Sequence, residues 1–273
     1  MEHNKIITLC FSCDDRNYSM AIDQSRATIK VNAAFESVIV VQNLYGTLAL
    51  DKHDISSLKR EGIRLYIQFG KGLSRSRNLA LSYVATLYAW ILDGDIKINK
   101  NELSRLVDLI RSSKDDTPFF LVKAKCLEHD RDFKRYNRFH CSSIEQILRV
   151  SSIEMIVNST IQKNLGVWFN ERLGLGGDFC GTEEADFLLS MYRKKKSKVS
   201  YFNIHPVIHT CMAENRSKPG ISIFYARGNI LRRIGGLKSL FIFFYWAVKF
   251  SYSWRTLKVI SYLYKGYRYG LPS

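Results

Sequence analysis

Two aspartates separated by one glycine, Asp93 and Asp95, follow the strongly apolar segment 89–92. Carboxylates at this spacing can hold a divalent cation, and Mg²⁺ is usually bound by one or two carboxylates together with substrate phosphate oxygens. A cation in such a place can act as a Lewis acid toward a departing diphosphate. An ordinary Asp-Gly turn is the simpler explanation of the same residues, so the pair is informative only beside other motifs.

A basic segment, Gly72–Asn78, leads into a predicted helix. Ser74 is a suitable N-cap residue, since its hydroxyl can accept a bond from a free backbone N–H of the first turn. Arg75 and Arg77 place two planar donors near a helix start, where anions bind well. A basic surface loop is the alternative explanation.

Acidic residues open the next candidate helix, which follows Gly181. Glu183 and Glu184 suit the positive end of a helix dipole, which is a purely structural role. One of these carboxylates could instead accept a proton from an attacking hydroxyl group.

Two histidines, His205 and His209, follow a short predicted strand. A neutral imidazole there could complete a metal site. A lone histidine is more often simply hydrogen-bonded within the fold, and that alternative stays open.

The segments that must position these residues alternate between apolar strands and helix-like stretches. We expect strands at 6–12, 37–42, 64–68 and 89–92, and helices at 20–32, 53–61 and 73–87. This order predicts an α/β fold with a mostly parallel sheet and helices on both faces. Ligands of such sheets bind beyond the carboxyl ends of the strands, where Asp14, Gln42, Gly72 and Asp93 all fall.

The second half of the chain is less regular. We expect helices at 102–111 and 183–193 and strands at 119–123 and 199–202, whereas segments 144–150 and 152–157 fit either type.

The charge of the 273-residue chain, formally +16, is unevenly distributed. Residues 215–273 contain eleven Lys or Arg, no Asp or Glu, and 14 of the 35 aromatic residues. Their longest apolar charge-free run, 239–248, falls short of the ~20 residues that cross a bilayer. This composition favours a segment that lies in the interface of an anionic leaflet, although a helical subdomain packed on the body would also explain it.

Other classes of protein are disfavoured by composition. With 46% hydrophobic residues and four prolines, the chain is not wholly disordered. No zinc-finger spacing and no RNP-like motif is present, so nucleic acid is not an expected partner. The first five residues do not resemble a secretory signal, and we expect a cytoplasmic protein.

Taken in order, the motifs resemble those of the family 2 glycosyltransferases, and in particular of bacterial capsule and O-antigen polysaccharide transferases. The resemblance covers about residues 5–212 and rests on Gly72-Leu-Ser-Arg-Ser-Arg-Asn78, Ile91-Leu-Asp-Gly-Asp95, Phe169-Asn-Glu-Arg-Leu-Gly174, Gly181-Thr-Glu-Glu-Ala-Asp-Phe187 and His205-Pro-Val-Ile-His209. It implies the GT-A nucleotide-diphospho-sugar transferase fold.

The resemblance implies a metal-dependent site. Asp95 corresponds to the direct ligand of Mn²⁺ or Mg²⁺, and Asp93 to the carboxylate nearer the sugar-nucleotide, also counted as a ligand. His209 corresponds to a position that often touches the metal or the diphosphate.

The resemblance also implies roles for the reacting groups. Arg77 corresponds to an arginine that contacts the donor. Glu184 corresponds to the usual catalytic base, with Glu183 the second candidate and Asp186 a distant third.

An acceptor region is implied as well. The loop Gly174–Gly176 resembles the family's acceptor loop, and Trp168 is a candidate platform for a sugar ring. Binding of the acceptor is therefore assigned to Trp168 and Gly176.

Two departures concern the donor base. Cys10–Asp14 stands where the family commonly has Pro-x-Tyr-Asn, and Gln42 with Asn43 replaces an acidic residue that reads the base or ribose. Asp14 or Asp15 could take over that role.

These implications give one functional hypothesis and one rival. Residues 1–214 would form an inverting glycosyltransferase domain that uses a nucleotide-sugar, with a UDP-sugar favoured, and a lipid-linked saccharide acceptor in cell-surface polysaccharide synthesis. Residues 215–273 would attach it peripherally to the anionic cytosolic face of the inner membrane. The rival is a catalytically idle, membrane-associated scaffold with a transferase-like fold.

Overall fold

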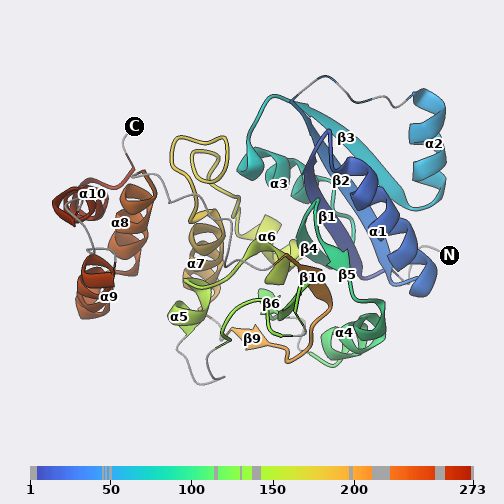
Figure 1. Cartoon of the computed structure of the whole chain (residues 1–273). Helices are drawn as coiled ribbons and strands as arrows, with labels where there is room; N and C mark the ends of the chain where they lie inside the picture. The colour runs from blue at the N-terminus through green and yellow to red at the C-terminus, as the bar shows by residue number, and fades with distance from the viewer. Residues whose placement is uncertain are drawn as a thin grey trace.

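A seven-stranded sheet in the order β3-β2-β1-β4-β8-β6-β9 forms the centre of the molecule (Figure 1). The computed structural model describes residues 5–44, 46, 48, 51–113, 116–129, 131–136, 143–196, 199–210, 222–249 and 256–271. Strands β1 (Ile7–Asp14), β2 (Phe35–Asn43), β3 (Ile63–Phe69) and β4 (Tyr88–Asp93) are parallel. Strand β8 (Met155–Asn158) runs antiparallel to β4 and to β6 (Phe119–Leu121), and β9 (Ser200–Tyr201) is parallel to β6.

A smaller sheet joins the turn after β4 to the last strand of the body. It contains β5 (Lys97–Ile98), β10 (Val207–His209) and β7 (Ala124–Cys126), with β10 antiparallel to β5 and parallel to β7. Because β5 begins two residues after Asp95, this pairing brings His209 to the end of β4.

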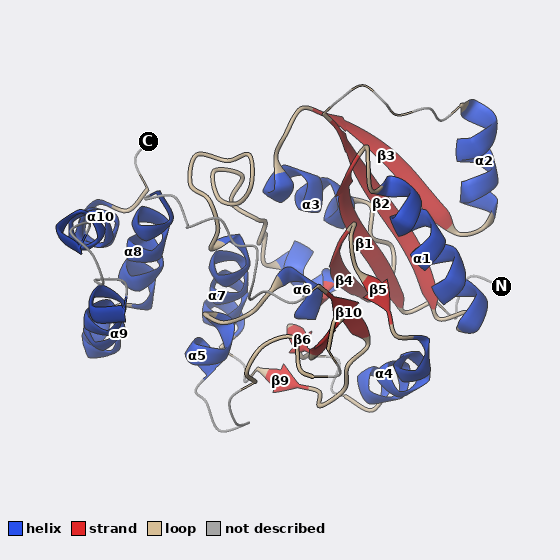
Figure 2. Ribbon diagram, in the orientation of Figure 1, coloured by secondary structure: helices blue, strands red, loops and turns tan. Residues whose placement is uncertain are grey.

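Helices cover both faces of the large sheet, as Figure 2 shows. The core on one face includes side chains of α1 (Tyr18–Val31), α2 (Lys52–Arg60) and α4 (Leu103–Arg111). The core on the other face includes side chains of α3 (Leu73–Ser82), α5 (Ser143–Ile147), α6 (Ser159–Asn164) and α7 (Glu183–Lys195). Strands β1 and β2 are buried at nearly every position, which explains their almost continuous apolar sequences.

Three further helices stand beside α7: α8 (Ser222–Ile234), α9 (Gly236–Lys249) and α10 (Thr256–Tyr269) (Figure 1). Helix α8 contributes Ile230 to the core that α7 shares. Within the described part of the chain, no helix has the length and apolar content needed to cross a membrane.

The expected α/β architecture is confirmed, with differences in detail. The helix that begins at Leu73 ends at Ser82, not at residue 87. Beyond the end of the helix, Thr86 is buried and bonds to Thr8 of β1 and to the carbonyl of Tyr88. Segment 144–150 overlaps helix α5, and segment 152–157 covers a 3-10 turn, Ser152–Glu154, and most of β8. The expected boundary at 214/215 lies outside the described residues.

Helices α8 and α10 approach each other unusually closely through two glycines. A Cβ atom on Gly228 would lie 2.1 Å from the carbonyl oxygen of Leu263, and one on Gly266 would lie 2.1 Å from that of Tyr225. No side chain fits either position without separating the two helices.

We therefore expect Gly228→Ala to push α10 away from α8 at a cost of about 1–3 kcal/mol, the usual penalty of overpacking. Hydrogen–deuterium exchange should show faster exchange in both helices, while the strands of the large sheet keep their protection. Ser261→Ala, an exposed change on α10, is the control and should leave exchange unaltered. Equal protection of α8 and α10 in Gly228→Ala and in the wild type would contradict this packing.

Candidate active site

The side chain of Arg77 lies at the centre of a cluster of carboxylates. Only 2% of it is exposed, and its Nη2 atom lies 3.0 Å from Oδ1 of Asp93. Its Nη1 atom lies 3.2 Å from Oε1 of Glu184 and 3.4 Å from Oε1 of Glu183. The ring of Phe169 lies 5.5 Å from the guanidinium carbon. Burial alone would lower the pKa of Arg77, but the three carboxylates outweigh it and raise that pKa, so the group stays charged.

Three element ends meet at this cluster. Arg77 lies on the buried face of α3, Asp93 is the last residue of β4, and Glu183 and Glu184 are the first two residues of α7. The second oxygen of Asp93 accepts a hydrogen bond of 2.9 Å from the hydroxyl of Ser152. Both oxygens of Asp93 are therefore engaged by neighbouring protein groups.

The two glutamates differ in their surroundings. The Glu183 side chain is 6% exposed and that of Glu184 is 18% exposed. Burial and repulsion from Glu184 raise the pKa of Glu183 from its ordinary value of 4.5 to about 7, against the opposing effect of Arg77. Thr182, just before them, has a left-handed backbone with φ of 71°, a conformation that non-glycine residues rarely adopt. Glu184 is thus the glutamate with an oxygen open to a substrate.

Asp95 and His209 form a second pair beside the cluster. Nε2 of His209 lies 3.4 Å from Oδ1 of Asp95, and 56% of the Asp95 side chain is exposed. Their interaction lowers the pKa of Asp95 and raises the pKa of His209. An exposed carboxylate beside an imidazole is a donor set that fits a divalent cation of the Mn²⁺ type.

The start of α3 is held by the loop that precedes α7. The side-chain oxygen of Gln42 accepts a 2.9 Å hydrogen bond from the Gly72 N–H, and the Leu73 N–H donates to the Leu175 carbonyl at 2.9 Å. The hydroxyl of Ser74 donates to the Leu173 carbonyl at 2.6 Å. The predicted N-cap role of Ser74 is wrong: the cap position is Gly72, and Ser74 connects two segments instead.

Gly176 packs closely against the residues before α3. Its φ is +86°, and a Cβ atom there would lie 2.9 Å from the Gly72 nitrogen and 2.7 Å from Cγ of Lys71. A glycine is therefore required at this position by packing alone. Its predicted contact with an acceptor stays a prediction.

Two other predicted ligand residues have different surroundings. Asp14 pairs with Gln42 in the β1–β2 register and forms an ion pair of 2.7 Å with Arg16. Trp168 is 41% exposed and lines a shallow hollow with Arg75 and Leu79 of α3. No carboxylate of the cluster lines that hollow.

Asp186, the third candidate base, is bound by an arginine of helix α8. Arg233 of α8 forms an ion pair with its carboxylate and also donates to the hydroxyl of Ser190 at 2.6 Å. Tyr225 of α8 stacks on Phe179, four residues before the first catalytic candidate. Helix α8 thus supports the segment that carries Glu183 and Glu184.

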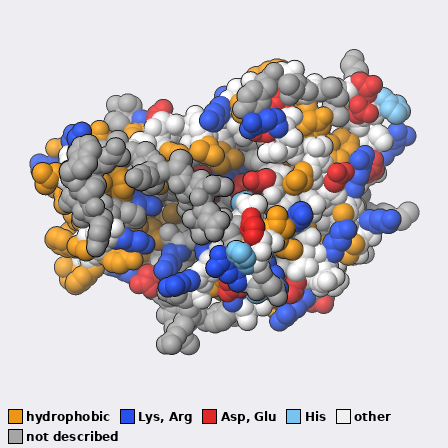
Figure 3. Space-filling model, viewed as in Figure 1, with side chains coloured by type: hydrophobic (Ala, Val, Ile, Leu, Met, Phe, Trp, Pro, Cys, Tyr) orange, Lys and Arg blue, Asp and Glu red, His pale blue; other side chains and the backbone are white. Residues whose placement is uncertain are grey.

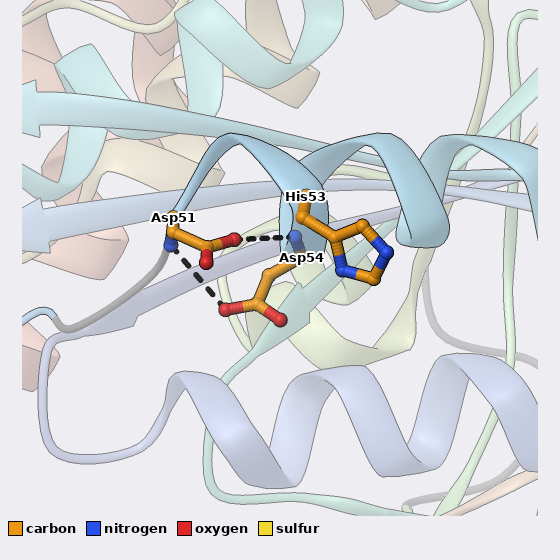
Figure 4. Close-up of side chains that lie close together, drawn as sticks. All are labelled: Asp51, His53 and Asp54. Carbon is orange, nitrogen blue, oxygen red and sulfur yellow. Dashed lines mark hydrogen bonds between the residues drawn. The ribbon is translucent and has the colours of Figure 1, made fainter.

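A separate group of possible metal ligands lies at the start of α2 (Figure 4). One ligand atom from each of Asp51, His53 and Asp54 lies within 4.8 Å of the others, and all three residues are exposed. Asp51 and Asp54 already form a capping box, in which each side chain accepts a bond from the other residue's N–H. We interpret this group as the cap of α2.

The structure thus brings Arg77, Asp93, Glu183 and Glu184 into contact and places Asp95 with His209. Sequence reasoning missed Ser152, which lies 59 residues from its partner Asp93 and belongs to no motif. It also missed Phe169 as the ring beneath Arg77, although the motif around that residue had been singled out.

Comparisons with known proteins identify the fold. One similar structure is residues 1–349 of S. aureus TarS, a glycosyltransferase, which is 14% identical to this chain with a TM-score of 0.60. The match covers 96% of this chain and 72% of the TarS chain. That fragment in complex with UDP-GlcNAc is 16% identical with a TM-score of 0.53, covering 97% and 73%. A longer TarS structure matches with 16% identity and a TM-score of 0.60. That match covers 92% of this chain but only 44% of the TarS chain.

No protein-family model matches the sequence, and no curated protein matches it significantly. The chain therefore has the nucleotide-sugar transferase fold, which the structural likeness shows without specifying a substrate.

The pKa of Glu183 gives a pH dependence of stability. Folded Glu183 keeps its proton up to about pH 7, whereas the unfolded group loses it above 4.5, so the contribution of Glu183 to stability falls as the pH rises through this window. In metal-free buffer, Glu183→Gln should be more stable than the wild type at pH 8, by about 2 kcal/mol, and this gain should vanish near pH 4.5.

Urea unfolding between pH 4.5 and pH 8 measures this difference. Asp108→Asn, a change at an exposed carboxylate of α4, is the control and should run parallel to the wild type. A Glu183→Gln curve parallel to the wild-type curve would show that Glu183 does not carry the raised pKa.

Proposed function

We propose that this chain is an inverting glycosyltransferase that moves a sugar from a nucleotide-sugar donor to a hydroxyl group of a saccharide acceptor. The observation that carries the proposal is the meeting of Glu184, Asp93 and the Asp95–His209 pair at the carboxyl edge of the sheet. Such an edge is where open α/β sheets bind ligands. The glycosyltransferase fold of the chain supports the same chemistry.

The donor proposed is a nucleotide-sugar, with a UDP-sugar favoured because structures of TarS with UDP and with UDP-GlcNAc share the fold. Asp95 and His209, with Asp93 beside them, would hold Mn²⁺ or Mg²⁺, which supplies positive charge for the diphosphate. Gln42 and Asp14, at the ends of β2 and β1, lie on the side where we expect the nucleoside.

Arg77 acts in this scheme as a positioning residue. Its guanidinium is buried against three carboxylates and has no exposed face for a diphosphate. Its proposed contact with the donor is therefore indirect, through Asp93. Because it also bonds Glu184, it fixes the base relative to the donor site.

Glu184 is the proposed catalytic base. Its carboxylate takes the proton of the acceptor hydroxyl, and the oxygen forms a bond to the anomeric carbon. The bond from that carbon to the diphosphate oxygen breaks on the opposite side, so the configuration inverts. Glu183 is the second candidate. It is adjacent to Glu184, but it ranks lower because its side chain is more deeply buried.

Removing the base should therefore lower turnover while donor binding persists. We expect Glu184→Gln to reduce sugar transfer by a factor of ~10²–10⁴, with the affinity for nucleotide and Mn²⁺ unchanged. Turnover is measured over a panel of nucleotide-sugars with saccharide acceptors, and Asp108→Asn, an exposed change on α4, serves as control. Near-normal turnover in Glu184→Gln would assign the base elsewhere.

The acceptor proposed is a lipid-linked saccharide of cell-surface polysaccharide synthesis, met at the cytosolic face of the inner membrane. Trp168 and the Gly174–Gly176 loop are the proposed acceptor contacts, of which Trp168 offers an exposed ring. The C-terminal helices support the membrane part of this proposal, and residues 215–273 are its proposed anchor.

Helix α9 presents an apolar stripe to solvent. Its exposed large side chains recur at helical spacing, at Leu237, Leu240, Phe241, Phe244, Tyr245 and Val248. Figure 3 shows hydrophobic side chains gathered over α9 and α10 at the left edge of the molecule. Lys238 and Lys249 lie near the two ends of the stripe, and no acidic residue follows Glu214. A stripe of this kind fits the interface of an anionic leaflet better than a second, equally basic copy of the chain.

The stripe can be tested without any sugar chemistry. We expect Phe241→Glu with Phe244→Glu to abolish co-sedimentation with vesicles that contain phosphatidylglycerol, because both charges would enter the apolar layer. The control is Phe69→Glu, which changes an equally exposed phenylalanine at the end of β3. If the double variant and the Phe69→Glu control pellet equally, the membrane proposal is wrong.

A further inference from the structure

A pocket rich in basic side chains lies beside the carboxylate cluster, at the carboxyl end of β6. Four basic residues and two tyrosines line it: Lys123, Lys134, Arg135, Arg149, Tyr136 and Tyr201. They come from the segment after β6, the loop after β7, the end of α5 and strand β9. We refer to this cavity as the basic pocket.

The wall of the basic pocket contains a buried, neutralised ion pair. Glu154 is 2% exposed, pairs with Nζ of Lys134, and accepts a 2.5 Å hydrogen bond from the hydroxyl of Tyr136. Lys134 also donates to the carbonyl of Arg149 and to the hydroxyl of Ser151. Lys134 is therefore fully occupied by protein groups and serves to build the pocket.

The remaining cations give the pocket an excess of positive charge. Arg135 and Arg149 are exposed, and Lys123 lies 3.9 Å from Asp132, which is itself 42% exposed. Two acidic residues, Glu145 and Glu154, face four basic ones among the lining residues. Arginine presents paired N–H donors that match the oxygens of a phosphate or carboxylate group.

The 3-10 turn Ser152–Glu154 connects the basic pocket to the candidate active site. Ser152 bonds Asp93 on one side, and Glu154, two residues on, forms the pocket wall. Strand β6 runs parallel to β4, since both are antiparallel to β8, so their carboxyl ends lie at the same edge. The pocket therefore lies on the β6–β9 side of Asp93, whereas Asp14 and Gln42 lie on the β1–β2 side.

We propose that the basic pocket binds an anionic group of the acceptor saccharide, a phosphate or a carboxylate, while the sugar hydroxyl is presented to Glu184. The proposal rests on the proposed function. The donor diphosphate is not the expected occupant, because its proposed ligands, Asp95 and His209, are not among the residues that line the pocket. Tyr136 and Tyr201 supply ring surface next to the charged rim.

The test measures anion binding by isothermal titration, in metal-free buffer so that the donor site is idle. The probes are inorganic pyrophosphate and glucuronate, which separate a phosphorylated acceptor from a carboxylated one. We expect one of the two to bind the wild type, and Arg135→Gln with Arg149→Gln to weaken that binding at least tenfold. Both arginines are exposed, so the double variant should fold.

Three controls make the outcome specific. Arg111→Gln, at the end of α4, should bind the anion like the wild type. Asp95→Ala should also bind it normally, because the donor site is not involved. Binding of UDP with Mn²⁺ should be unchanged in the double arginine variant, and its absence in the wild type would count against the proposed function alone. Binding of neither probe, or equal binding in the double arginine variant, would overturn the basic-pocket proposal.

Discussion

The buried guanidinium of Arg77 is the interaction on which the site depends. Asp93, Glu183 and Glu184 would repel one another at this distance without a cation between them, and Arg77 would be costly to bury without carboxylates around it. The ends of α3, β4 and α7 are therefore fixed relative to one another by one charge balance. The proposed base Glu184 and the carboxylate of Asp93 are both held in place by Arg77.

The sequence predicted the parts of the structure that depend on local patterns, and it failed where distant residues meet. The sheet and its ligand edge could be predicted from local patterns, because an apolar strand or a glycine-rich turn is recognisable from its own residues. The burial of Arg77 does not: a basic residue near a helix start predicts a surface anion site, and its partners lie 16, 106 and 107 residues away. Ser74 was misjudged for a similar reason, since its partner Leu173 is 99 residues distant.

The C-terminal helices link the body that carries the candidate site to the exposed apolar stripe. Helix α8 is part of the body, because Arg233 binds Asp186 and Tyr225 stacks on Phe179, next to the strained turn before α7. Helix α9, joined to α8 by a short glycine turn, exposes its apolar stripe instead. In the proposed arrangement the chain docks through α9, α8 holds the segment that carries the candidate catalytic carboxylates, and the basic pocket lies on the proposed acceptor side.

The most direct test of the account is the thermal stability of the protein with UDP, GDP, dTDP and CMP, with and without Mn²⁺, in the wild type and in Asp95→Ala. A ligand at a hundredfold excess over its dissociation constant stabilises the folded state by ~2.7 kcal/mol. We predict a Mn²⁺-dependent rise in melting temperature with UDP that Asp95→Ala abolishes. A cooperative melt unmoved by every nucleotide would contradict the account and favour a scaffold that keeps only the fold.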